Sequence, residues 1–135
     1  MGVGAYARQI DNARTPHDWI CTDPAVVDAY RADELCGAMF SVGGYASLTA
    51  TARCASRAPK DLPVLFIAGA EDPVGACGKG VEAAAELMRR AGVRDVELHL
   101  YDGMRHEILN EPGRTRVYTE VIDWIEEHAC RNATS

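Results

Sequence analysis

Two side chains capable of acid–base chemistry, Asp72 and His106, each follow a segment with the pattern of a β-strand. Asp72 comes just after the continuous apolar run of residues 64–69, and His106 comes after the alternating segment of residues 96–101. A continuous apolar run is typical of a parallel strand that is buried on both faces. Since ligands bind at the carboxyl ends of parallel strands, we expect the carboxylate and the imidazole to meet there.

An acid followed along the chain by a histidine is the order of the last two members of a Ser…Asp…His triad. In such a triad the imidazole of His106 takes a proton from a serine hydroxyl and returns it to the leaving group. Asp72 orients the imidazole and stabilises its protonated form. Each residue also has an ordinary interpretation, because aspartates are frequent in turns and helix caps and a loop histidine is often a surface residue.

The nucleophile of such a triad is missing from the sequence. A serine nucleophile needs a strained strand-to-helix turn of the form G-x-S-x-G. None of the four serines has that frame: Ser41, Ser47, Ser56 and Ser135. Cys77 belongs to the loop that carries Asp72, and we do not expect it to replace the serine.

Other kinds of site find little support in the sequence. His106-Glu107 begins like the HExxH zinc motif, but Asn110 stands where the second histidine is required, so no metal site is predicted. Glycines at positions 75, 78 and 80 match neither nucleotide-binding spacing. We expect them to form a loop that enters a helix.

Composition, charge and cysteine spacing set further limits. The chain has 47% apolar and 25% charged residues, as ordinary soluble globular proteins do. Its net charge of −6 argues against a nucleic-acid partner, and a longest basic run of Arg89-Arg90 argues against a stable membrane anchor. Five widely spaced cysteines indicate reduced thiols. With no signal-peptide pattern at the amino end, we expect a cytoplasmic location.

The periodicity predicts the order helix, helix, strand, helix, strand, helix. Asp23-Pro24 is typical of an N-cap followed by proline at the first helical position. The predicted helices cover residues 24–33, 40–56, 80–91 and 115–128, and the strands cover residues 64–69 and 96–101. The last helix is expected to turn four apolar residues inward: Val117, Val121, Ile122 and Ile125.

The strand–helix–strand unit implies a parallel sheet. A sheet of two strands leaves one edge open and its buried strand poorly covered. We therefore expect the chain to be the closing part of a larger sheet. Its open edge is expected to pair with a missing amino-terminal half or with a second copy.

Three stretches of the sequence resemble the α/β-hydrolase superfamily, and more narrowly the monoacylglycerol lipase, lysophospholipase and serine aminopeptidase group. They are residues 60–69 followed by Glu71-Asp72-Pro73-Val74, residues 78–81, and residues 100–111 with the run Asp102-Gly103-Met104-Arg105-His106-Glu107. Residues 14–37 resemble, more weakly, the end of that group's helical cap.

The resemblance implies an α/β fold in two parts. Residues 58–135 are expected to be the closing portion of the α/β-hydrolase core, with its last two parallel strands and flanking helices, and residues 1–57 a remnant of the helical cap. Asp72 is then the triad acid and His106 the triad base. Trp19 and Phe40, in the cap, are expected to cover an apolar pocket for an acyl chain, although such residues can simply bury the cap against the core.

The activity implied is that of a serine ester hydrolase acting on a glyceride or lysolipid, without metal or organic cofactor. The nucleophile and the oxyanion hole are expected in an amino-terminal half that this sequence lacks, so the chain alone is expected to be inactive. The alternative is a non-catalytic binding module that pairs through its open strand edge.

Overall fold

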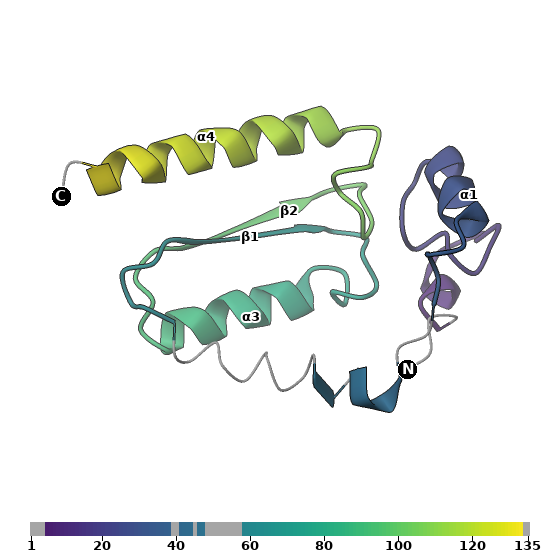
Figure 1. The fold of residues 1–135 in the computed structure, drawn as a ribbon, viewed down its shortest axis with the longest axis horizontal. Helices are drawn as coiled ribbons and strands as arrows, with labels where there is room; N and C mark the ends of the chain where they lie inside the picture. Colours follow the sequence, from purple (N-terminus) through teal and green to yellow (C-terminus); the bar gives the residue numbers. More distant parts are fainter. Residues whose placement is uncertain (1–4, 39–40, 45, 48–57, 134–135) are drawn as a thin grey trace.

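The computed structural model describes residues 5–38, 41–44, 46–47 and 58–133. In this part of the chain two parallel strands lie between two helices, and a third helix lies beside the carboxyl ends of the strands (Figure 1). Most of the helix predicted over residues 40–56, including Phe40, lies outside the described residues.

Helix α1, Pro24–Ala32, begins as the sequence predicts. The Asp23 carboxylate accepts a hydrogen bond from the Ala25 N–H at 2.8 Å, and Pro24 occupies the first helical position. Val27 on this helix is 1% exposed and joins Trp19, Ile20 and Cys21 in a small apolar cluster. The cap thus fixes where α1 starts, and Val27 fixes which face it buries.

Strands β1, Val64–Gly69, and β2, Val96–Tyr101, pair in parallel with Val64 opposite Val96 and Gly69 opposite Tyr101. Helix α3, Lys79–Arg90, connects them and ends before Gly92, which has φ +92° as a left-handed stop requires. These elements agree with the prediction. The fold is that of an α/β protein, with α3 on one side of the sheet and α4 on the other (Figure 1).

The end of β1 passes very close to the loop that follows β2. A Cβ added at Gly69 would overlap the backbone carbonyl oxygens of Met104 and Arg105. In addition, the Ala70 N–H donates to the Tyr101 oxygen at 2.9 Å and the Glu71 N–H donates to the Met104 oxygen at 2.9 Å. The two strand ends therefore hold their following loops against each other.

Helix α4, Arg114–Ala133, is longer than predicted, and its buried face is different. Val117 is fully buried and Val121 is partly buried, but Ile122 and Ile125 are 54% and 53% exposed. The inner positions that follow Val121 are instead Trp124 and His128, which contact the start of β2. The prediction for Ile122 and Ile125 was wrong because polar groups on β2 decide how the helix is rotated.

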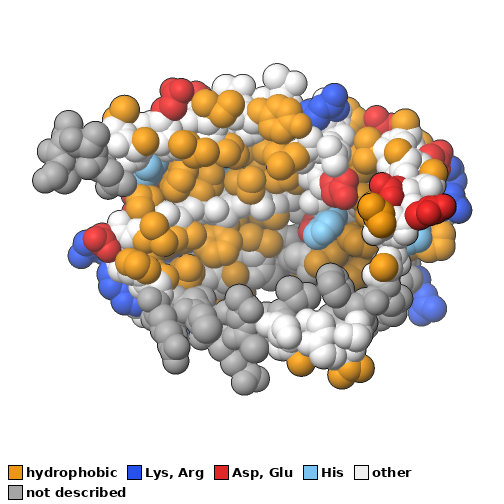
Figure 2. All heavy atoms as spheres, in the orientation of Figure 1, with side chains coloured by type: hydrophobic (Ala, Val, Ile, Leu, Met, Phe, Trp, Pro, Cys, Tyr) orange, Lys and Arg blue, Asp and Glu red, His pale blue; other side chains and the backbone are white. Residues whose placement is uncertain are grey.

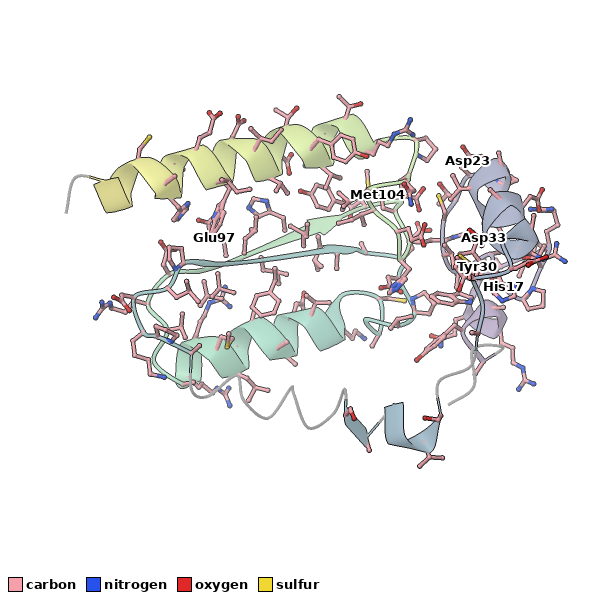
Figure 3. All side chains as sticks on the ribbon, viewed as in Figure 1. His17, Asp23, Tyr30, Asp33, Glu97 and Met104 are labelled. Atoms are coloured by element: carbon pink, nitrogen blue, oxygen red, sulfur yellow. The ribbon has the colours of Figure 1, made fainter. Side chains whose placement is uncertain are left out.

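The contacts of these two side chains show how α4 is fixed. Trp124 Nε1 donates to Glu97 Oε1 at 2.9 Å, and His128 Nε2 lies 3.1 Å from Asp95 Oδ2. Glu97 extends from β2 toward α4 (Figure 3). Polar groups at the amino end of β2 thus hold the second half of α4, while Tyr101 and Val117 form an apolar contact at the other end.

Candidate active site

The structure brings Asp72 and His106 together at the carboxyl end of the sheet. The imidazole Nδ1 lies 2.9 Å from the Asp72 Oδ2 atom. The Asp72 N–H donates to the Gly69 oxygen at 3.2 Å, which turns the chain directly after β1. The loop of residues 102–106 places His106 next to that turn, where its imidazole contacts Asp72. The contact between Asp72 and His106 that the order of strands and loops predicts is therefore present in the structure.

The electrostatics of the pair follow from unequal burial. Asp72 is 7% exposed, and its Oδ1 atom accepts a hydrogen bond from the Val74 N–H at 2.8 Å. The side chain of His106 is 42% exposed. The hydrogen bond that the imidazole donates to Asp72 raises the pKa of His106 above its ordinary value of 6.5, and partial burial of the imidazole opposes this.

This arrangement assigns the two ring nitrogens of His106. A carboxylate only accepts hydrogen bonds, so Nδ1 carries the proton that is donated to Asp72. In the neutral imidazole the lone pair is then on Nε2, which is available as a proton acceptor. This is the chemistry of a general base oriented by an acid.

Trp19 lies directly against the His106 imidazole. The residue is 8% exposed, and its ring centroid lies 5.2 Å from that of the His106 imidazole. The Trp19 carbonyl oxygen is 3.4 Å from the His106 backbone nitrogen, and the Tyr6 ring also contacts the Trp19 ring, with centroids 5.4 Å apart. The structure therefore brings Trp19 to the site, whereas Phe40 is outside the described residues.

A cavity of about 550 Å³ opens beside the acid–base pair. Asp72 and His106 lie in its wall, and the remaining lining is mostly apolar: Ile67, Ala68, Val74, Gly75, Val81, Glu107, Ile108, Leu109 and Asn110. A cavity of this kind suits a ligand with an apolar part that brings one polar group to the imidazole. Trp19 is not among the lining residues, so its contact is with the base rather than with this cavity.

The loop between Asp72 and α3 has an unusual backbone. Ala76 and Cys77 both have φ +52°, in the left-handed region, and Gly78 follows with φ +87°. The Cys77 N–H donates to the Asp72 carbonyl oxygen at 2.8 Å, which closes the loop back on the acid. Glycine is favoured at position 78 because side chains rarely adopt this positive φ, and a Cβ would also lie 2.7 Å from Leu100 Cδ1.

Sequence reasoning did not single out the two charged residues that fasten the His106 loop. Arg105 Nη1 donates to the carbonyl oxygens of Asp18 at 2.6 Å and Cys21 at 3.2 Å. Glu111, 1% exposed, accepts hydrogen bonds from the backbone of Arg105 and from Thr22. The Arg105 side chain and the Thr22–Glu111 contact each join segments more than eighty positions apart, which no local pattern reveals.

Among the described residues, one group of possible metal ligands lies away from this site. Asp95, Glu97 and His128 place one ligand atom each within 4.8 Å of one another. The imidazole is already engaged, since Nδ1 lies 2.7 Å from the Trp124 oxygen and Nε2 lies 3.1 Å from Asp95. The group is at the amino end of β2, opposite the end that carries His106, and the contacts described for α4 account for it.

No helix in the described part of the chain combines the length and apolar character needed to cross a membrane.

Comparison with known proteins agrees with the architecture. The model of the family described as "Serine aminopeptidase, S33" matches residues 3–113. The chain belongs to this family. The match begins well before residue 60, so it includes the segment around Trp19 that resembled the family only weakly in sequence.

Relatives of this S33 family member are ester hydrolases by name. A monoacylglycerol lipase of Mycolicibacterium smegmatis is 30% identical over 136 residues, which cover 93% of this chain and 45% of the relative. A solved carboxyl esterase from Bacillus coagulans, in complex with glycerol, superposes with a TM-score of 0.82 at 29% identity, covering 93% of this chain and 43% of the esterase.

A solved lipase in an open form gives a TM-score of 0.78 at 35% identity, covering 90% of this chain and 42% of the lipase. The described elements are thus part of an α/β-hydrolase fold, as predicted. The chain spans less than half the length of the relatives that it matches.

Proposed function

We propose that this chain supplies the acid and the base of a serine ester hydrolase, with Asp72 as the acid and His106 as the base. The observation that carries the proposal is the 2.9 Å contact between His106 Nδ1 and Asp72 Oδ2 at the carboxyl ends of two parallel strands. The family and the names of the relatives, lipases and an esterase, support the reaction class.

In the proposed reaction, Nε2 of His106 takes the proton of a serine hydroxyl as the oxygen attacks the ester carbonyl. Asp72 holds the imidazole in the correct tautomer and stabilises the imidazolium that forms. The imidazolium then gives its proton to the alcohol that leaves, and an acyl-enzyme remains. A water molecule, activated by the same imidazole, releases the acid and restores the serine.

The nucleophile in this proposal lies outside these 135 residues. None of the four serines of the sequence has the G-x-S-x-G frame. The relatives are more than twice as long as the part that this chain matches. We expect the chain alone not to hydrolyse esters, because the imidazole has no hydroxyl to activate and no oxyanion donors assist it. Loss of a single such donor costs about 10²–10³ in rate.

The surface that would receive the remaining part of the enzyme is the second edge of β1 with the adjoining face of α4. Within the described residues β1 pairs only with β2, and every residue of β1 before Gly69 is partly exposed although the strand is apolar throughout. Tyr118, Ile122 and Ile125 form an exposed stripe on α4. Hydrophobic side chains extend across the molecule between α4 and α3 (Figure 2). We propose that further strands of the same enzyme cover this surface; a second copy is the alternative that the molecular mass in solution tests.

The substrate class proposed is a fatty-acid monoester of glycerol. One relative is named a monoacylglycerol lipase, and the solved esterase holds glycerol. The mostly apolar cavity beside His106 suits an acyl chain. Trp19 contacts the imidazole, which supports a place for it beside the reacting ester, and Phe40 and residues 1–57 would belong to a cap over the acyl chain.

The test is ester hydrolysis by the whole protein captured from its source cells through an antibody to α4. We expect turnover of monoacylglycerol above turnover of lysophospholipid and of an aminoacyl amide, and loss of turnover in the Asp72→Asn and His106→Gln variants. The purified 135-residue chain is the control without a nucleophile. Undiminished turnover in the His106→Gln variant would refute the assignment of the base.

A further inference from the structure

The buried carboxylate of Glu111 is the most heavily hydrogen-bonded acidic group near His106. It is 1% exposed and accepts the Thr22 N–H on both oxygens, at 3.0 and 3.2 Å. It also accepts the Thr22 hydroxyl and, at 2.8 Å, the Arg105 N–H. These donors reach both oxygens of the side chain, whereas an amide would offer them a single oxygen.

Among the residues that the structure describes, no cation contacts the side chain of Glu111 directly. The Arg105 guanidinium donates to the backbone oxygens of Asp18 and Cys21, and Arg114 Nη1 lies 3.4 Å from the Glu111 backbone oxygen rather than its carboxylate. A buried charge without a counter-ion is costly unless hydrogen bonds replace its hydration. The donors from Thr22 and Arg105 provide that replacement, and they are charge-assisted and so stronger than neutral ones.

The two residues that donate hydrogen bonds to Glu111 belong to the segments that hold His106 in place. Arg105 directly precedes His106, and Thr22 ends the segment of residues 18–22 that carries Trp19. The same two segments are joined by the Glu107 N–H, which donates to the Ile20 oxygen at 2.8 Å. His106 is thus held on both sides, through Arg105 and through Glu107, against the segment whose tryptophan ring covers it.

We propose that Glu111 is a positioning residue, which acts through Arg105 and Thr22 to hold the His106 imidazole in line with Asp72 and beneath Trp19. This inference rests on the proposed function of His106 as the base. Displacement of the loop at Arg105 moves the imidazole away from the Asp72 carboxylate, which the Val74 N–H holds within its own loop.

The test uses the Glu111→Gln and Thr22→Val variants of the full chain, each close in size to the residue it replaces. With ¹⁵N-labelled histidine, we expect the His106 pKa in Glu111→Gln to fall toward 6.5 and the Nδ1–H resonance to be lost. Thr22→Val keeps the Thr22 N–H and loses only the hydroxyl, so we expect a smaller shift in the same direction. Glu126→Gln, which removes an exposed carboxylate from α4, is the matched control and should change neither signal.

A role in stability alone would lower the unfolding midpoint and leave both His106 signals of the folded chain unchanged, and that result overturns the proposal. If Glu111→Gln does not fold, the Thr22→Val chain decides by the same criterion. The readout is separate from hydrolysis. A whole protein that fails to cleave esters while His106 still depends on Glu111 would refute the proposed function and leave the positioning role standing.

Discussion

Replacing Asp72 with asparagine tests whether the carboxylate stabilises a protonated His106. Asparagine keeps the Oδ1 acceptor for the Val74 N–H, so the turn after β1 should survive, and only the charge facing the imidazole is removed. Asp72 makes the largest contribution to the raised pKa of His106, and burial lowers it. We therefore expect the His106 pKa in the variant to fall toward or below 6.5.

The magnitude follows from the geometry. Opposite unit charges 2.9 Å apart attract by about 1.4 kcal/mol at the dielectric constant of water. Because the His106 side chain is 42% exposed, solvent screens the pair, and exposed pairs contribute about 0.2–1 kcal/mol. We expect Asp72→Asn to lower the free energy of unfolding by about 1 kcal/mol, which is about 3–5 °C in midpoint for a chain of this size.

The loss of unfolding free energy in Asp72→Asn should become smaller as the pH rises. A histidine whose pKa is raised on folding contributes its full stabilisation below the unfolded value of 6.5, and that contribution is lost as the pH rises through the folded pKa. The difference between parent and Asp72→Asn should therefore be largest near about pH 5.5 and shrink by about pH 9.

Urea unfolding followed by circular dichroism measures the difference at both pH values, and histidine NMR gives the pKa directly. Asp123→Asn, which removes an exposed carboxylate from α4, is the matched control and should lose nothing at either pH. A loss of equal size at both pH values, or a His106 pKa unchanged in Asp72→Asn, would refute the reasoning.

Three further predictions concern the frame around the site. Gly69→Ala should lower the free energy of unfolding by about 1–3 kcal/mol and shift the His106 NMR signal, because the added Cβ overlaps backbone of the His106 loop; an unshifted signal would contradict this. The double change of Ile122 and Ile125 to serine should alter stability by less than about 1 kcal/mol and reduce self-association measured by light scattering; a large loss would mean that these side chains are buried. His128→Ala should cost about 1–3 kcal/mol in urea unfolding, because it leaves the Trp124 carbonyl and Asp95 without the imidazole; a neutral result would show that this end of α4 frays.

The local elements were predictable because their signals are local. Asp23-Pro24 fixes the start of α1 by capping chemistry, and the apolar and alternating runs give both strands with the bounds that the structure shows. Gly92 ends α3 through its positive φ. The parallel pairing follows from the strand–helix–strand order.

The buried face of α4 was not predictable, because two overlapping sets of residues recur with helical spacing. Ile122 and Ile125 are more apolar than Trp124 and His128, so a count of apolar positions favours the isoleucines. The structure favours the other set because Glu97 on β2 and Asp95 just before it offer hydrogen-bond acceptors to the indole and imidazole. Such a choice depends on the partner surface, which lies outside the helix's own sequence.

One part of the candidate site was predictable from the sequence and another part was not. That Asp72 and His106 would meet follows from a general property of parallel sheets, and the 2.9 Å contact confirms it. The hydrogen bonds from Thr22 to Glu111 have no local signal, because they join residues 89 positions apart that only the folded chain brings together. The roles of Trp19 and Phe40 at an acyl pocket stay predictions.

The central claim is that Asp72 and His106 serve a serine nucleophile in a protein longer than this chain. Labelling of source-cell extract with a fluorophosphonate, which reacts with activated serines, followed by capture with an antibody to α4, tests it most directly. The account predicts a labelled band at about twice 14.6 kDa that disappears in cells carrying His106→Gln. An unlabelled band at 14.6 kDa as the sole captured species would contradict it.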